Sequence, residues 1–168
     1  MINLQLNSKN DLRKEGKSFY WASFFLPKKS KKNAGILYSI CRYFDNIADN
    51  NNEDKTNFLK HSIEEIKNNK NNKVNIFLHK NEINNSIFID LIQGFIFDQR
   101  KIRIQNKEEL IKYSYHVAGT VGLMMSKIIG VRNEKASKSA IDLGIGMQLT
   151  NIARDVYEDS KMKRIYLP

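Results

Sequence analysis

The chain has 168 residues, of which 41% are hydrophobic, and its 28 basic and 18 acidic side chains give a formal net charge of +10. This length and apolar content exclude a disordered protein and suit one domain with a substantial core. The single cysteine, Cys41, excludes an intramolecular disulfide. His61, His79 and His116 have no partners at metal-ligand spacing, which argues against a zinc site.

The positive charge fits an acidic partner such as phosphate, nucleic acid or an anionic membrane surface, although a Lys- and Asn-rich solvated surface gives the same charge without one. The N-terminal residues lack the apolar core of a signal peptide. The longest apolar segment, "SIFIDLIQGFIFD", is interrupted by Asp90 and is too short to cross a bilayer, which takes about 20 apolar residues. We therefore expect a cytoplasmic protein that is soluble or lies peripherally on the inner face of the membrane.

Helical patterns fill most of the sequence, and no alternating strand pattern with hairpin turns stands out. A short aromatic helix, "KSFYWASFFLP", is expected to close at Pro27. The polar segment "NNKNNK", at 68–73, is expected to be a loop. Further helices are predicted over residues 32–50, 53–69, 82–99, 106–130 and 133–159. The chain is thus predicted to be an all-α domain without internal repeats.

A polar stripe runs along the helix predicted at 32–50. Its members are Tyr38, Cys41, Arg42, Asp45 and Asp49. Their spacing places them on one face, with the two carboxylates about 6 Å apart along the axis. Cys41 neighbours the apolar side of this helix, so inert packing is expected for it.

A second stripe with the same spacing is predicted on the last helix, and its members are Gln148, Asn151, Asp155 and Asp159. Carboxylates beside apolar residues need partners, and Mg2+ bound together with a diphosphate would suit them. Arg42 and Arg154 could then bind the diphosphate oxygens. The alternative is ordinary surface residues that pair with nearby lysines.

Four segments around these stripes resemble the phytoene and squalene synthases, and bacterial phytoene synthases most of all. They are "SFYWASFFLP", "YSICRYFDNIAD", "YHVAGTVGLMM" and "LGIGMQLTNIARDVYEDSKMKRIYLP", and they occur in the family's order and spacing over nearly the whole chain. The resemblance implies the all-α isoprenoid synthase fold. Members of the family continue past "YLP" with further helices, so we expect residues 1–168 to be the N-terminal portion of the bundle, incomplete at its C-terminus.

The resemblance also implies roles for individual residues. Asp45 and Asp49 match the first metal-binding motif, and Asn151, Asp155 and Asp159 match the second; both would hold Mg2+, with Mn2+ as a substitute, and the four aspartates would be catalytic. Ser18, Tyr38, Arg42 and Arg154 match positions that contact the diphosphate in the family, and Gln148 matches a polar position close to the reacting carbons. Phe19, Tyr113, Val117 and Leu143 match the wall of a prenyl-chain tunnel, although without the resemblance they would be ordinary core.

The implied activity is that of a prenyltransferase in carotenoid biosynthesis: two geranylgeranyl diphosphates condense head to head to phytoene, through a cyclopropylcarbinyl diphosphate. The expected partner is a prenyl diphosphate and not nucleic acid. One alternative is squalene or dehydrosqualene synthesis from farnesyl diphosphate. Another is an inactive fragment that only binds diphosphate or a membrane surface.

Some positions depart from the family pattern or stay open. Asn46 and Gln93 stand where relatives often carry Asp, and neither Gln93 nor the nearby Asp98 is given a role. Nothing in the sequence pairs with His116, which is given no role either. Gly119 and Gly122 weaken the helix around them, which predicts a close helix approach or kink, or a break between two helices.

Overall fold

The computed structural model describes residues 16–49, 54–99 and 102–168. These ranges are helical almost throughout, and their one extended pairing is an isolated parallel bridge between Arg103 and Ile165. The all-α prediction is therefore confirmed. None of the described helices has the length and apolarity that crossing a membrane requires.

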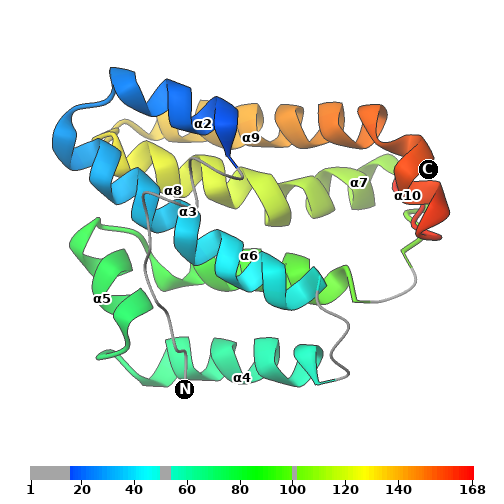
Figure 1. Cartoon of the computed structure of the whole chain (residues 1–168), viewed down its shortest axis with the longest axis horizontal. Helices are drawn as coiled ribbons and strands as arrows, with labels where there is room; N and C mark the ends of the chain where they lie inside the picture. The colour runs from blue at the N-terminus through cyan, green and yellow to red at the C-terminus, as the bar shows by residue number, and fades with distance from the viewer. Residues whose placement is uncertain (1–15, 50–53, 100–101) are drawn as a thin grey trace.

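The described elements follow one another in a helical bundle (Figure 1). They are α2 (Lys17–Ala22), the 3-10 turn η1 (Ser23–Phe25), α3 (Lys28–Asp49), α4 (Lys55–Asn68), α5 (Lys73–Lys80), α6 (Asn85–Phe97), α7 (Lys107–Ser114), the π-helical turn η2 (Tyr115–Gly119), α8 (Thr120–Ile128), α9 (Glu134–Arg154) and α10 (Val156–Lys161). Helices α7 and α8 form one continuous rod through η2. This rod packs against both α3 and α9 and so lies between them.

Asparagine side chains begin four of the helices. Asn72, Asn84, Asn106 and Asn133 each accept a hydrogen bond from a backbone N–H in the first turn that follows. The cap at Asn72 explains why the loop prediction for residues 68–73 is wrong at its edges. Helix α4 runs on to Asn68, and α5, a helix that the sequence pattern did not predict, begins directly after the cap.

The core lies in two clusters on the faces of α6 and the α7–α8 rod. The larger cluster includes Leu37, Phe44, Leu59, Phe88 and Met124, each 1% exposed or less, from α3, α4, α6 and α8. The smaller cluster consists of Ile102, Ile104, Leu110, Tyr113, Ile152 and Tyr166. It joins α7 and α9 to the C-terminal segment, and it therefore holds the region of the second acidic motif in place.

Glycines let α9 approach the rod closely. A Cβ at Gly122 would lie 2.2 Å from the Ala140 carbonyl oxygen, and one at Gly144 would lie 2.4 Å from the Ala118 carbonyl oxygen. Both distances are too short for any side chain, so the contact depends on glycine. The predicted close approach is confirmed, whereas a break at Gly119 is wrong, because the chain stays helical through η2.

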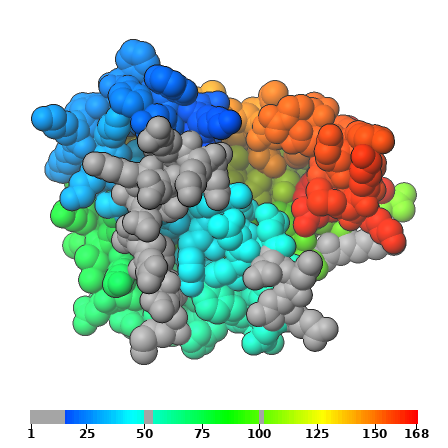
Figure 2. Space-filling model, in the orientation of Figure 1, coloured from blue at the N-terminus to red at the C-terminus, as the bar shows by residue number. Residues whose placement is uncertain are grey.

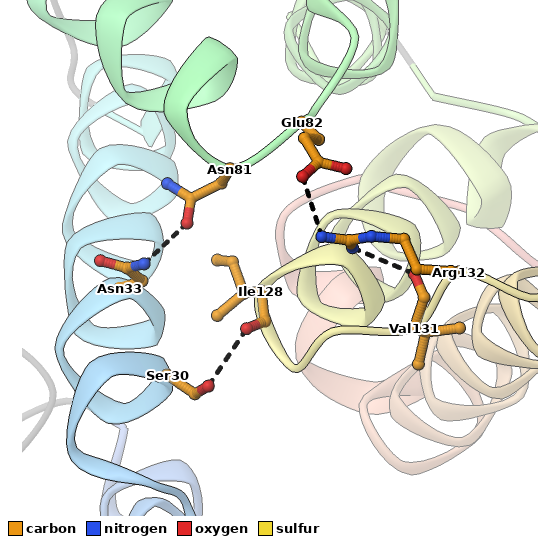
Figure 3. A network of polar contacts seen from close by, with 7 residues as sticks. All are labelled: Ser30, Asn33, Asn81, Glu82, Ile128, Val131 and Arg132. Carbon is orange, nitrogen blue, oxygen red and sulfur yellow. Dashed lines mark hydrogen bonds and ion pairs between the residues drawn. The ribbon is translucent and has the colours of Figure 1, made fainter.

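Polar contacts fasten the start of α3 to two turns that are distant in sequence (Figure 3). Ser30 Oγ donates to the Ile128 carbonyl at 3.2 Å, and Asn33 Nδ2 donates to Asn81 Oδ1 at 2.7 Å. Arg132 then links the α8–α9 turn to Glu82 at 3.0 Å. This end of the bundle, on the left of Figure 1, is the end opposite to both acidic motifs.

Candidate functional site

The first acidic motif lies near the C-terminal end of α3, a helix of 22 residues whose other face is buried in the larger core. Asp45 and Asp49 are one turn apart on it, as the spacing predicted. Arg42 Nη1 donates to Asp45 Oδ2 at 2.5 Å, and about a third of each side chain is exposed. Asp49 is exposed. A guanidinium and two carboxylates are therefore available together on one partly open surface.

Two other members of this stripe are packed against neighbours. Tyr38 is half-buried, and its ring centre lies 6.5 Å from that of Phe19 on α2, which also carries the exposed Ser18. Cys41 is partly buried against the larger core cluster, and its desolvation there, together with the charge of Asp45, raises the pKa of its thiol to about 12. Cys41 therefore stays protonated at neutral pH, which supports the expectation of inert packing.

The second motif does not lie on one unbroken helix, so that prediction is wrong. Helix α9 ends at Arg154, Asp155 has φ −99° and ψ 14°, and α10 begins at the next residue. A carboxylate is unfavourable at a helix C-terminus and favourable at an N-terminus, which is consistent with a bend at this position. The Asp155 N–H still donates to the Asn151 carbonyl, at 2.9 Å, and the Asp159 N–H donates to the Asp155 carbonyl, at 2.8 Å. The backbone hydrogen bonds between residues four positions apart are thus kept across the bend.

Asp155 is held by its neighbour in sequence. Arg154 donates through Nε to Oδ1 at 2.6 Å and through Nη2 to Oδ2 at 2.7 Å, and these bonds lower the pKa of the Asp155 carboxyl. The pKa of Asp159 is raised, first by burial and then by the charge of Asp155. The second motif therefore pairs an arginine with crowded carboxylates, as the first does. Asn151 and Gln148, one and two turns earlier on α9, are partly buried.

Asp98, for which the sequence pattern indicated no role, lies at the centre of a hydrogen-bonded cluster. It follows α6 directly, and its two carboxylate oxygens accept from Tyr113 Oη at 3.1 Å and from Tyr166 Oη at 3.0 Å. The two tyrosine rings stack with centres 5.0 Å apart. Burial raises the pKa of Asp98 to about 6. An acid that ends the apolar run "GFIF" was the signal available in the sequence, because such an acid needs donors.

This cluster connects the two motifs. The charge of Asp49 raises the pKa of Asp98, whereas the charge of Arg164 lowers the pKa values of both Asp98 and Asp159. These interactions place the C-terminal ends of α3, α6 and α10 at the same end of the bundle, on the right of Figure 1. Backbone bonds fix the last segment there, since the Ile104 N–H donates to the Ile165 carbonyl at 2.9 Å.

The donors of the two motifs suit a hard divalent cation, because all of them are oxygens and because the charge of Asp155 already raises the pKa of Asp159. Within the described ranges, however, no three His, Cys, Asp or Glu side chains are grouped closely enough to hold a metal by themselves. Mg2+ is commonly held by one or two carboxylates and completed by substrate phosphates, which agrees with this arrangement. Convergence of both motifs on shared Mg2+ stays a prediction.

The residues expected to form a tunnel wall differ in exposure. Phe19 is 55% exposed and Leu143 is 67% exposed, Val117 is half-buried, and Tyr113 is 7% exposed within the smaller core cluster. Figure 2 shows the yellow-green surface of the α7–α8 rod set back between the cyan atoms of α3 and the orange atoms of α9. In the described part of this chain, Phe19 on α2 and Leu143 on α9 are therefore largely open to solvent.

A cleft of about 290 Å³ lies between α6, α7 and η2, and Gln93, Phe97, Lys112, Tyr113 and His116 are among its lining residues. His116 Nδ1 lies 2.8 Å from the Lys112 carbonyl oxygen, so the expectation that nothing pairs with this histidine is wrong.

Known proteins match this chain over most of its length. The squalene/phytoene synthase family model matches residues 12–168. A 15-cis-phytoene synthase of Enterobacter agglomerans is 32% identical over 90% of the chain, and a phytoene synthase of Thermus thermophilus is 34% identical over 94% of it. The chain spans only 58% and 56% of the lengths of these two relatives.

Two solved structures share the fold. A dehydrosqualene synthase determined in complex with a ligand has a TM-score of 0.83 and 33% identity, and the match covers 95% of this chain and 59% of that one. The squalene synthase HpnC from Alicyclobacillus acidocaldarius has a TM-score of 0.84 and 20% identity, over 99% of this chain and 68% of that one. These likenesses confirm the isoprenoid synthase fold. Since the family model spans nearly all residues, the chain belongs to the squalene/phytoene synthase family.

Proposed function

We propose that this chain provides the diphosphate-binding part of a prenyltransferase that condenses two geranylgeranyl diphosphates head to head to phytoene, in carotenoid biosynthesis. The observation that carries the proposal is the pair of acidic motifs, each with its own arginine, at one end of the bundle. Identity of 32% and 34% to phytoene synthases over 90% and 94% of the chain supports this branch of the family.

Asp45 and Asp49 on α3, and Asn151, Asp155 and Asp159 around the α9–α10 bend, would hold Mg2+ or Mn2+ together with the substrate diphosphates. When bound, the ions supply positive charge that offsets the negative charge on the departing diphosphate.

The two arginines are expected to change partners when substrate binds. Each one now neutralises a carboxylate, Arg42 that of Asp45 and Arg154 that of Asp155. A diphosphate offers the guanidinium groups oxygens of higher charge, which suit bidentate binding. Transfer of each arginine to the diphosphate would leave its aspartate free to bind a cation. Ser18 and Tyr38 would add contacts to the same diphosphate.

In the first half-reaction the C1–O bond of one substrate breaks, and both electrons leave with the diphosphate. The double bond of the second substrate attacks the allylic cation, and loss of a proton gives the cyclopropylcarbinyl diphosphate. A second ionisation, rearrangement and proton loss then give phytoene. Water must be excluded, since it would capture either cation. Phe19, Tyr113, Val117 and Leu143 are proposed to form the apolar wall, with Gln148 near the reacting carbons.

Squalene or dehydrosqualene synthesis from farnesyl diphosphate is the second candidate. It is favoured by the likeness to the dehydrosqualene synthase structure, whose identity to this chain, 33%, is comparable with that of the phytoene synthases. The two candidates differ in chain length and not in the chemistry of the diphosphate end.

The test is chromatographic analysis of products formed from geranylgeranyl or farnesyl diphosphate with Mg2+, by the 168-residue chain and by the full product of its gene. We expect phytoene from the full gene product. We expect little condensation by the chain alone, because Phe19 and Leu143 are open to water, so that prenyl alcohol would form instead. Squalene-type products from farnesyl diphosphate, without phytoene, would select the second candidate. Efficient phytoene formation by residues 1–168 would show that this chain excludes water without further helices.

A further inference from the structure

One hydroxyl group of the α7–α8 rod is buried without a partner. Ser114, the last residue of α7, is 0% exposed, and its Oγ has no hydrogen-bond partner among the described residues. Two other buried hydroxyls of the rod, those of Thr120 and Ser126, each donate to a backbone carbonyl at 2.7 Å. A buried hydroxyl without a partner is unfavourable, so Ser114 needs a polar group that the rod itself does not supply.

The register between the rod and α9 shows which residue lies opposite Ser114. The two helices run antiparallel, side by side, and the glycine contacts fix their register at two points (Figure 1). These are Gly122 against Ala140 and Ala118 against Gly144. A further step of four residues along each helix pairs Ser114 with Gln148.

The local backbone and the packing agree with this pairing. The wide turn of the π-helical η2 separates Ser114 from Ala118, and residues four positions apart in it lie on the same face, here the face toward α9. One step beyond the pair, the same register brings together Leu110 and Ile152, which both belong to the smaller core cluster. Gln148, partly buried on α9, is therefore the polar side chain opposite the Ser114 hydroxyl.

An amide side chain has two different ends, and its orientation matters at a site where positive charge forms. Gln148 is proposed above to lie near the reacting carbons. Its Oε1 would stabilise an allylic cation, whereas its Nε2 hydrogens would repel one. An amide that turns over freely would present each end for part of the time. A partner that accepts from Nε2 would keep the oxygen toward the cation.

We propose that Ser114 is a positioning residue for Gln148: its Oγ accepts a hydrogen bond from Gln148 Nε2, so that Oε1 faces the carbons that react. The inference rests on the proposed function, and Ser114 acts through Gln148 and not on the substrate.

The test is a double-mutant cycle in the full gene product. Ser114→Ala should lower kcat about tenfold and change KM less than about twofold, because the diphosphate is bound by other residues. In a Gln148→Ala background, Ser114→Ala should lower kcat by less than about twofold more, since no amide is left to orient. Independent effects, with a further tenfold loss in the double variant, would overturn the proposal.

Stability separates positioning from packing. Ser114→Ala removes a hydroxyl that has no partner, so the melting temperature should stay the same or rise while kcat falls. A melting temperature that falls together with kcat would mean that Ser114 has a structural role only. Ser114→Cys keeps a group of similar shape that is a weak donor and acceptor, and kcat should recover to within about threefold of the wild-type value.

Ser137→Ala is the matched control. Ser137, near the other end of α9, is 8% exposed, and its Oγ likewise has no partner among the described residues. The register places an apolar residue, Met125, opposite to it, so kcat should not change. If Ser137→Ala lowers kcat as much as Ser114→Ala does, loss of any buried hydroxyl between these helices has this effect, and the proposal is wrong.

A second readout does not require turnover. In the NMR spectrum of the 168-residue chain, the side-chain amide protons of Gln148 are identified by their loss in Gln148→Leu. Ser114→Ala should shift both of them, and Ser137→Ala should leave them in place. Unshifted signals in Ser114→Ala would overturn the proposal. If the signals shift but the full gene product condenses neither geranylgeranyl nor farnesyl diphosphate, the proposed function fails and the pairing of Ser114 with Gln148 stands.

Discussion

The two acidic motifs share a four-residue spacing but lie on different backbones. Asp45 and Asp49 belong to one unbroken helix whose opposite face is buried, with Phe44 0% exposed between them and the core. Asp155 and Asp159 flank a bend, and beside them Val156 is 45% exposed and Tyr157 is 66% exposed. Packing against α4, α6 and α8 therefore sets the position of the first motif. The second depends on a few specific contacts.

Those contacts are the buried Ile152, which is 3% exposed, and the Asp98 cluster with its two tyrosines. The comparison shows that equal spacing in sequence does not make two ligand sets equally rigid. The first motif should tolerate changes around it, whereas small changes should displace the second.

Loss of one aspartate from either motif should have a large effect on activity. In the full gene product, Asp45→Ala and Asp155→Ala should each reduce turnover by about a hundredfold or more, because a ligand and its charge are lost at the departing diphosphate. The melting temperature of Asp155→Ala should not change, since this side chain is partly exposed at a bend. Turnover is measured with geranylgeranyl diphosphate at saturating Mg2+.

Glu158→Ala is the control for that experiment, since it removes an exposed carboxylate of α10 outside the motif. Turnover lost equally in Glu158→Ala would mean that the general negative charge of this end matters, and not the motif.

Glycine substitutions should change the free energy of unfolding differently on the packed face and on the open face of α9. Gly144→Ala places a Cβ 2.4 Å from the Ala118 carbonyl oxygen, and backbone cannot move aside cheaply, so the free energy of unfolding should fall by about 3 kcal/mol. At Gly146 a Cβ meets nothing within 4 Å, so Gly146→Ala should be neutral or should stabilise the helix by up to about 1 kcal/mol. Urea unfolding measures both. Equal destabilisation by the two would contradict the close α8–α9 contact.

The free energy of unfolding should depend on pH through Asp98, whose cluster holds the second motif in place. Its pKa is about 6 in the folded chain against 3.8 for the free group, so the folded state holds the proton more tightly. The free energy of unfolding should therefore be constant below about pH 4, fall between pH 4 and pH 6, and level off above. Partial exposure limits the fall to about 2 kcal/mol.

Asp98→Asn cannot titrate and should abolish this fall, whereas Asp142→Asn, an exposed carboxylate on α9, should keep it. If the slope between pH 4 and pH 6 persists in Asp98→Asn, another group causes it.

The sequence predicted most helices because apolar residues recur at helical spacing over many turns, as in α3 and α6. It missed α5, which follows a polar run of Asn and Lys, since the cap at Asn72 is a local hydrogen bond and not a pattern. The close approach of α9 to the rod was partly predicted from Gly122, but its partner Gly144 was not singled out.

At the site, spacing and resemblance together indicated the acidic residues, and the structure brings both motifs to one end. Two features could not be predicted, namely the bend at Asp155 and the identity of the donors to Asp98. The bend at Asp155 preserves the i, i+4 hydrogen bonds, so the sequence repeat is the same with or without it. The Asp98 cluster joins Asp98 to Tyr166, which is 68 positions away, and the periodicity of a sequence carries no information on so distant a contact.

A smaller effect should come from one hydrogen bond of that cluster. Tyr166→Phe removes the hydroxyl that donates to Asp98 Oδ1 at 3.0 Å and keeps the stacked ring, so the free energy of unfolding should fall by about 1 kcal/mol. The loss should be local. The Arg164 N–H, which donates to the Asp159 carbonyl at 2.9 Å, should exchange with solvent faster, while the amides of α3 around Asp45 keep their protection.

Tyr157→Phe removes a hydroxyl from an exposed ring of α10 and serves as the control, with no change expected in either region. Hydrogen exchange followed by mass spectrometry distinguishes the outcomes. Faster exchange confined to the segment after Asp155 is expected, because only the second motif depends on the Asp98 cluster. Equal acceleration in α3 would mean that the two motifs open together, and the second motif would then be no easier to displace than the first.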